Sequence, residues 1–214
     1  MLVQWIETCK LHAEIIVVVD GENLATYENL SKLSFVKVAG YPVNKGKGYA
    51  IKFGFKMATA PLIIYTDADI PFEGNSILKM FETLQQYQHQ NIWVIGDRTL
   101  PGSVYFENIS WLRKAGSDLF LLIIKHTLGE RFADTQCGLK GFTKKGGEMV
   151  FAQSKINRFA FDFECLFIAG KLDLKVIEIP VILRNQSPST VRLVRDGSAL
   201  LKDVLKVIFI NRYD

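Results

Sequence analysis

Short apolar segments alternate with longer amphipathic segments through the first half of the chain, and this alternation constrains the fold most. The short segments are rich in β-branched residues, as strands are, whereas the longer ones carry apolar residues at helical spacing. Strands that alternate with helices indicate βαβ units and a mostly parallel sheet. We therefore expect an α/β fold with helices flanking the sheet. The expected strands are Ala13–Val19, Phe35–Ala39, Pro61–Thr66 and Ile92–Gly96, and the expected helices are Leu24–Leu33, Tyr49–Thr59 and Ser76–Tyr87.

Two aspartates, Asp67 and Asp69, follow the third of these strands. The apolar run Pro61–Ile64 predicts a strand buried on both faces, and such a run ends at carboxylates because an uncompensated buried charge is costly. Open α/β sheets bind ligands at the carboxyl ends of their strands. Residues i and i+2 of an extended chain share a face, so we expect both carboxylates to point the same way and to hold Mg²⁺ or Mn²⁺. A solvated turn is the alternative that the triplet alone leaves open.

Asn44–Gly48 places two lysines among glycines directly before a predicted helix. Glycines let backbone amides approach a phosphate closely, and the N-terminus of a helix favours an anion. An ordinary flexible loop is the alternative. The segment does not have the spacing of a P-loop, and no Gly-x-Gly-x-x-Gly follows the first strand, which disfavours a nicotinamide cofactor.

The second half of the chain has a different pattern. Ser103–Leu128 is helical in pattern, Thr135–Phe142 is punctuated by glycines, Phe159–Ala169 predicts a helix, and Leu174–Ile179 predicts a strand that Pro180 ends. The helix carries two carboxylates, Asp162 and Glu164, which either cap it or face a site. We expect a main domain over residues 1–180 and a basic tail over residues 181–214. The tail ends in an amphipathic helix, Ala199–Asn211, which lies on a membrane surface or packs on the domain.

Composition excludes several classes of protein. A length of 214 residues with 49% hydrophobic residues favours one large domain with a sizeable core. A net charge of +4 suits an anionic small molecule or an acidic membrane surface and does not by itself indicate nucleic acid. Three scattered cysteines disfavour a disulfide framework or a zinc site and favour a reducing compartment, and we interpret Cys137 as a small buried residue rather than a nucleophile.

No secretory signal is recognisable, and apolar stretches such as Leu119–Ile124 are too short to span a membrane. We expect a cytoplasmic protein, or one that is peripheral on the cytoplasmic face of a membrane.

Taken together, these segments resemble the family-2 glycosyltransferases of the GT-A fold, a Rossmann-like α/β fold. Within that family they are most similar to the dolichyl-phosphate glucosyltransferases and related polyprenyl-phosphate glycosyltransferases. The specific part of the resemblance is the pair Asp-Thr-Gln-Cys-Gly-x-Lys and Phe-Asp-x-Glu. The matching segments, in family order, are Glu14–Gly21, Asn44–Gly48, Asp67–Asp69, Asp134–Phe142, Arg158–Glu164, Ile179–Val181 and Ser189–Arg192.

The resemblance implies an inverting transfer of a hexose from a nucleoside diphosphate sugar, with UDP-glucose favoured, to a polyprenyl or dolichyl phosphate. It implies that Asp69 and Asp67 hold Mg²⁺ or Mn²⁺ on the donor diphosphate. It also implies roles for three further groups of residues. The nucleotide-sugar would contact Asp20, Lys45, Gly46, Lys47, Asp67 and Ala68; the acceptor phosphate would contact Arg98, Arg113 and Arg192; and Asp134, Asp162 or Glu164 would orient the acceptor or the sugar.

The chain departs from the family pattern at three places. Family members begin with a strand and a Pro-x-Tyr-Asn-Glu segment, whereas this chain starts at what resembles the following helix, so we expect the first strand of the fold to be missing. The usual aspartate pair is Val19-Asp20 here, and Pro71 stands where several relatives have a metal-binding glutamine. The alternatives are a catalytically impaired GT-A remnant that binds nucleotide-sugar or serves as a membrane-surface partner, and a sugar-phosphate nucleotidyltransferase.

Overall fold

The computed structural model describes residues 12–104, 134–158, 160–184, 203, 204, 206 and 207. In chain order, the elements within these residues are β1 (Ile15–Asp20), α2 (Leu24–Ser31), β2 (Val36–Tyr41), α3 (Lys47–Met57), β3 (Leu62–Tyr65), α4 (Gly74–Gln86), β4 (Ile92–Asp97), β5 (Lys140–Thr143), α6 (Lys144–Gln153), α7 (Phe161–Lys171) and β6 (Lys175–Pro180).

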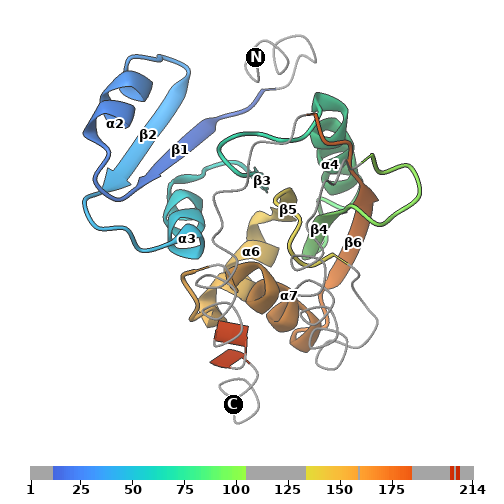
Figure 1. Cartoon of the computed structure of the whole chain (residues 1–214). Coiled ribbons are helices and arrows are strands. Elements are labelled where there is room, and N and C mark those ends of the chain that lie inside the picture. Colours follow the sequence, from blue (N-terminus) through green and yellow to red (C-terminus); the bar gives the residue numbers. More distant parts are fainter. Residues whose placement is uncertain (1–11, 105–133, 159, 185–202, 205, 208–214) are drawn as a thin grey trace, which may run out of the picture.

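The strands form two sheets at different ends of the molecule (Figure 1). β1 and β2 pair in parallel in a two-stranded sheet, and the other four strands lie in the order β3-β5-β4-β6. The α/β fold with flanking helices is therefore confirmed. The larger sheet is mixed, because β5 runs antiparallel to both of its neighbours while β4 and β6 pair in parallel.

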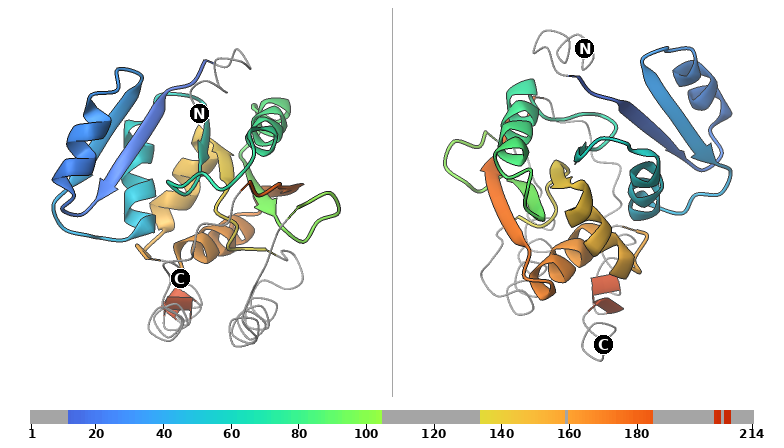
Figure 2. Two further views of the ribbon diagram at one scale, coloured as in Figure 1. Left: turned by 45° about the horizontal axis from the view of Figure 1, so that its top comes forward. Right: turned by 180° about the vertical axis from the view of Figure 1, so that it is seen from behind.

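Helices cover both faces of the larger sheet (Figure 2). Successive side chains of a strand point to opposite faces, and β4 follows this rule. Trp93 is buried in a cluster with residues of α6 and α7, whereas Ile92 and Val94 are buried in a cluster with Met80 and Leu84 of α4. The core of the protein therefore lies on both sides of β4.

Glycines bring helices close to this sheet. A Cβ atom on Gly141 of β5 would lie 2.8 Å from a methyl group of Leu84 in α4. Only glycine lets α4 pack at this distance, because real Cβ atoms keep at least van der Waals separation. The glycine-punctuated segment Thr135–Phe142 thus contributes a central strand.

The smaller sheet is joined to the rest of the protein by Glu14, just before β1. One of its carboxylate oxygens accepts hydrogen bonds from the backbone N–H and the hydroxyl of Thr59, and the other lies 2.6 Å from Lys37 Nζ. The ammonium group of Lys37 and the Thr59 donors lower the pKa of Glu14 to about 2. Because Thr59 lies between α3 and β3, Glu14 fixes the start of β1 beside the start of β3.

Part of the tail also packs on the domain. Val204 and Val207 are helical and fully buried, in the same cluster as Phe161 and Phe163 of α7. Most of the expected helix over residues 103–128, and residues 185–202, 205 and 208–214 of the tail, lie outside the described residues. Within the described residues, no helix combines the length and the apolar character needed to cross a membrane.

Candidate active site

Asp67 and Asp69 lie in a turn directly after β3. The backbone N–H of Ile70 donates a 2.9 Å hydrogen bond to the carbonyl oxygen of Asp67, which closes the turn around Ala68. The expectation that the two aspartates share one face of an extended chain is therefore wrong, since this hydrogen bond turns the backbone back on itself. The Asp67 side chain is 44% exposed, and Asp69 and Ala68 are exposed. Both carboxylates are accessible to solvent at the carboxyl end of β3.

The segment from Asp134 to Leu139 packs against this turn. A Cβ atom on Gly138 would overlap the carboxylate of Asp67, at a separation that no real pair of atoms adopts. Gly138 therefore makes room for the Asp67 side chain and brings the two segments into direct contact.

Lys47, the first residue of α3, lies between two carboxylates. Its Nζ atom is 3.0 Å from Asp67 Oδ1 and 3.0 Å from Asp162 Oδ2. Burial alone would lower the pKa of Lys47, but the negative charges of Asp162 and Asp67 outweigh this effect and raise it above its ordinary value. Lys47 is therefore a fixed positive charge beside Asp67.

Asp162, in the first turn of α7, is buried at the centre of this cluster. Its Oδ1 atom accepts a 2.8 Å hydrogen bond from the hydroxyl of Tyr65 and lies 2.9 Å from Lys140 Nζ. Burial alone would raise the pKa of Asp162, yet the ammonium groups of Lys140 and Lys47 and the Tyr65 hydroxyl bring it well below its usual range. Asp162 is thus ionised and holds two lysines in place.

Lys140 begins β5 and is completely buried. Its backbone pairs with Tyr65 of β3 on one side and Ile95 of β4 on the other. Besides Asp162, its ammonium group bonds the carbonyl oxygen of Cys137 at 2.6 Å. The roles of Lys140, Tyr65 and Gly138 were not predicted from the sequence. The available signal was a lysine placed among small and apolar residues, since a buried lysine needs a partner.

Asp20, at the end of β1, organises the glycine-rich loop. Its two carboxylate oxygens accept hydrogen bonds from the backbone N–H groups of Lys45, at 2.7 Å, and Gly46, at 2.9 Å. Gly46 has a φ of 95°, and a Cβ atom there would lie 2.6 Å from the carbonyl oxygen of Asn157. Lys45 extends over the ring of Tyr49, with Nζ 4.3 Å from its centroid. Asp20 and Gly46 therefore position the residues that precede Lys47.

Asp134 forms a two-point ion pair with Arg98, which follows β4. The Nε and Nη2 atoms of Arg98 lie 2.6 Å and 2.8 Å from the two carboxylate oxygens, and the backbone N–H of Arg98 donates a third bond at 3.1 Å. Burial alone would raise the pKa of Asp134, but the guanidinium group lowers it below its ordinary value. The pair fixes the beginning of the segment that carries Gly138.

Glu164 does not belong to this cluster. Its carboxylate accepts hydrogen bonds from the hydroxyl of Ser154 and from the backbone N–H groups of Lys155 and Ile156. These bonds attach Glu164 to the loop after α6, apart from the cluster around Asp67. Arg113 and Arg192, which were expected to contact an acceptor phosphate, lie outside the described residues.

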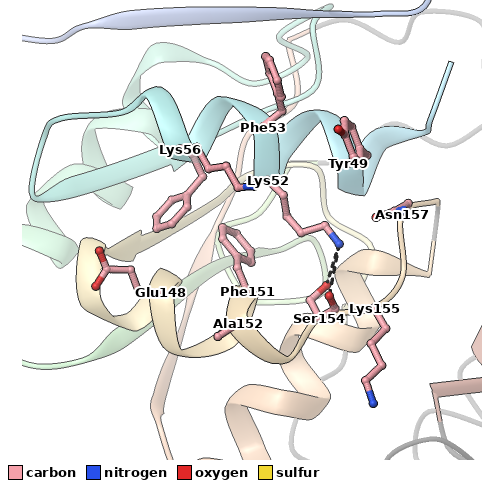
Figure 3. A pocket seen from close by; sticks show the side chains of 11 residues that line it. Tyr49, Lys52, Phe53, Lys56, Glu148, Phe151, Ala152, Ser154, Lys155 and Asn157 are labelled. Atoms are coloured by element: carbon pink, nitrogen blue, oxygen red, sulfur yellow. Dashed lines mark hydrogen bonds between the residues drawn. The ribbon is translucent and has the colours of Figure 1, made fainter. Parts of the chain in front are cut away.

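A cavity of about 560 Å³ lies between α3 and α6 (Figure 3). Phe53, Lys56, Phe151 and Lys155 are among its lining residues, and Lys52 Nζ donates hydrogen bonds to Ser154 at its edge. None of the expected site residues lines it. It is therefore distinct from the cluster around Asp67.

Several polar atoms beside the cluster have no hydrogen-bond partner among the described residues. Thr66 Oγ1 is adjacent in sequence to Asp67, and Thr135 Oγ1 and Gln136 Nε2 follow Asp134. Because buried polar groups are nearly always hydrogen-bonded, these atoms are candidates to bond a ligand.

The two carboxylates of the turn suit a hard divalent cation, which prefers oxygen ligands. No group of three or more histidine, cysteine and acidic side chains with metal-binding geometry occurs in the part of the chain that the structure describes. Mg²⁺ bound with a phosphorylated substrate usually has one or two carboxylate ligands, and the substrate and water supply the remaining oxygen ligands.

Comparison with known proteins gives consistent results. The family model described as "Glycosyl transferase family 2" matches residues 2–146. The dolichyl-phosphate beta-glucosyltransferase of Dictyostelium discoideum is 26% identical over 208 residues, covering 94% of this chain and 64% of the relative. Dolichyl-phosphate beta-glucosyltransferase ALG5A of Trichomonas vaginalis is 31% identical over 216 residues, covering 93% of this chain and 62% of the relative. The chain thus spans less than two thirds of the length of these relatives.

Solved structures show the same fold. Glucosyl-3-phosphoglycerate synthase from Mycobacterium tuberculosis, in complex with phosphoglyceric acid, superposes with a TM-score of 0.68 at 14% sequence identity. The match covers 92% of this chain and 70% of the synthase chain. Mannosyl-3-phosphoglycerate synthase from Rubrobacter xylanophilus has a TM-score of 0.68 at 14% identity, covering 96% of this chain and 65% of its own.

Proposed function

The chain belongs to glycosyl transferase family 2, and we propose that it transfers a hexose from a nucleoside diphosphate sugar to a polyprenyl phosphate, with inversion at the anomeric carbon. Glucose and dolichyl phosphate are the first choices, because the similar proteins of Dictyostelium and Trichomonas are dolichyl-phosphate beta-glucosyltransferases. The observation that carries the proposal is the cluster in which Asp67 lies against Gly138 and Lys47 at the carboxyl end of β3.

Asp67 and Asp69 would hold Mg²⁺ or Mn²⁺ on the donor diphosphate. When bound, the cation would act as a Lewis acid that stabilises negative charge on the departing nucleoside diphosphate. The fold neighbour from Mycobacterium tuberculosis has been solved in complex with Mn²⁺ and UDP-glucose, which supports UDP-glucose and Mn²⁺ as the first donor and cation to test.

The residues of this chain would position the donor. Lys47, fixed by Asp162, would place a positive charge beside the diphosphate, and the backbone of Lys45–Gly46, fixed by Asp20, would lie next to the nucleotide. Thr135 Oγ1 and Gln136 Nε2, which have no partner among the described residues, would bond hydroxyl groups of the sugar. Positioning of this kind accounts for much of the rate gain when one reactant is already a nucleophile.

The acceptor phosphate oxygen is anionic, so its attack on the anomeric carbon needs no strong general base. As the new carbon–oxygen bond forms, the bond from that carbon to the diphosphate breaks and its electron pair leaves with the nucleoside diphosphate. Arg98, Arg113 and Arg192 are our candidates for binding the acceptor phosphate, because guanidinium groups match phosphate oxygens. Since Asp134 already binds two nitrogen atoms of Arg98, we favour Arg113 and Arg192 as the main contacts.

We further propose that the protein acts as a peripheral protein on the cytoplasmic face of a membrane, where the acceptor lies. The basic and apolar composition of residues 181–214 supports contact with a lipid surface.

The test is transfer of labelled sugar to lipid. Purified protein is incubated with Mn²⁺, vesicles that contain dolichyl phosphate, and either UDP-glucose or GDP-mannose, and lipid-linked sugar is measured. We expect product from UDP-glucose with the wild type, and a loss of about 100-fold or more in Asp69→Ala, since an interaction that stabilises the leaving group is removed. Glu82→Gln, at an exposed position of α4, is the control and should keep full activity.

Mn²⁺-dependent binding of UDP, measured by calorimetry, separates the possible failures. Binding without transfer to any lipid would favour a nucleotide-sugar-binding protein over an enzyme. The proposal would be refuted by the absence of both binding and transfer.

A further inference from the structure

Lys47 is shared between two carboxylates in very different surroundings. Its Nζ atom is 3.0 Å from Asp67, whose side chain is 44% exposed, and 3.0 Å from Asp162, whose side chain is 3% exposed. Asp162 also has Lys140 and Tyr65 as partners, whereas Lys47 is the cation beside Asp67 in the described part of the chain. The two contacts of Lys47 therefore differ in how easily they can be exchanged.

The contact with Asp162 is the more permanent of the two. Asp162 is ionised and buried, and a buried carboxylate that loses a cationic partner incurs a large desolvation cost. Asp67 is in contact with solvent, so another cation can replace Lys47 there at low cost. Asp162 therefore anchors the lysine next to the site, and Asp67 is the exchangeable partner.

We propose that Lys47 and the divalent cation compete for Asp67, and that this competition makes the cation and the nucleoside diphosphate bind synergistically. This inference rests on the proposed function. The ammonium group opposes binding of the cation alone, because it occupies one oxygen of Asp67 and repels a second positive charge. A diphosphate brings negative charges that both cations attract, so its arrival relieves the repulsion. Lys47 thus gives rise to a coupling free energy between the two ligands.

The coupling predicts that replacing Lys47 changes the affinity for Mn²⁺ alone and the affinity for UDP with Mn²⁺ in opposite directions. An ion pair of this exposure contributes up to about fivefold to an equilibrium constant, and repulsion between neighbouring cations adds to it. We therefore expect Lys47→Met to bind Mn²⁺ alone about tenfold more tightly than the wild type does. We expect the same variant to bind UDP more weakly in the presence of Mn²⁺, because a positive charge beside the diphosphate has been lost. If the role of Lys47 were purely structural, its replacement would weaken the binding of both Mn²⁺ and UDP.

The experiment measures bound Mn²⁺ by electron paramagnetic resonance, with and without UDP, after correction for the Mn²⁺ that UDP binds in solution. Lys56→Met removes the same charge at an exposed position of the same helix and should match the wild type. Lys47→Arg keeps the charge and should restore weak binding of Mn²⁺ alone. Lys47→Gln replaces Lys47→Met in the test if the methionine variant does not fold.

Unchanged or weaker binding of Mn²⁺ alone by the Lys47 variants would overturn the inference, and the proposed function would stand as long as the wild type binds Mn²⁺ together with UDP. A wild type that binds no Mn²⁺ even with UDP would refute the proposed function itself.

Discussion

Removal of Lys140 tests whether the buried cluster is as tightly coupled as its geometry indicates. Lys140 is completely inaccessible to solvent, and its ammonium group lies 2.9 Å from Asp162, which is 3% exposed. Loss of one member of a buried ion pair costs about 3–5 kcal/mol when the remaining charge has no other partner, and the lower end of this range applies here because Asp162 keeps Lys47. We expect Lys140→Met to lower the free energy of unfolding by about this amount, a large share of the roughly 5–15 kcal/mol that stabilises a typical domain.

The measurement is urea denaturation of the single variants Lys140→Met and Asp162→Asn and of the double variant. Each single variant leaves the charge of the remaining residue buried, whereas the double variant removes both charges. We therefore expect the double variant to be more stable than the sum of the single effects predicts, by at least about 2 kcal/mol.

Lys144→Met is the matched control. Lys144 is partly buried, but among the described residues its ammonium group hydrogen-bonds the backbone carbonyl oxygens of Phe55 and Ala58, at 3.2 Å and 2.8 Å, and no carboxylate. Its removal should cost about 1–2 kcal/mol, the usual cost of a buried acceptor that loses its donor. The reasoning would be refuted if Lys140→Met were no more destabilising than Lys144→Met, or if the effects of Lys140→Met and Asp162→Asn were additive.

Three further predictions concern neighbouring residues. Gly138→Ala should displace the Asp67 carboxylate and lower Mn²⁺-dependent UDP affinity by about tenfold or more in calorimetry, while thermal unfolding shifts by only a few degrees; wild-type affinity would contradict this. The lowered pKa of Asp162 stabilises the fold above about pH 4, so the stability difference between the wild type and Asp162→Asn should shrink as the pH falls from about 4 to about 2 in urea denaturation, and a growing difference would show the sign to be wrong. Burial raises the pKa of Cys137 to about 11 and that of Cys165 well above its ordinary value, so peptide mapping should find both thiols unreacted after native treatment with iodoacetamide and alkylated only in denaturant; rapid native labelling would count against the packing around them.

The strands that end in acidic residues could be predicted from the sequence, because a buried apolar run and a charge that follows it are both local signals. Asp20 and Asp67 therefore come out at the carboxyl ends of β1 and β3, as expected. The prediction that failed here, an extended chain from Asp67 to Asp69, also concerns local backbone structure. The turn that the Asp67–Ile70 hydrogen bond closes ends at Ile70, and the φ of 44° at this isoleucine is rare enough that no propensity argument favours it.

β5 and α6 were not predicted, because glycines in both segments are typical of loops. In the structure, the glycines of these two segments make room for, or bond, residues that are distant in the sequence. Gly141 admits the side chains of α4, and Gly147 lies where a Cβ atom would come within 2.9 Å of the Phe55 ring. The carbonyl oxygen of Gly146 accepts a hydrogen bond from the indole N–H of Trp93. Such requirements arise only when the elements pack, so intrinsic propensity does not reveal them.

The pair Asp162 and Glu164 shows where sequence reasoning reaches its limit at the site. Residues two positions apart on a helix lie about 200° apart around its axis, so the predicted helix already excludes a single site that both carboxylates face. It does not say which of the two faces the site. That choice depends on Lys47 and Lys140, which reach Asp162 from α3 and β5, and on the loop after α6, whose N–H groups bind Glu164. Which of the two carboxylates joins the cluster around Asp67 therefore depends on the cations that the other elements bring to it, and Asp162 is the one beside Lys47 and Lys140.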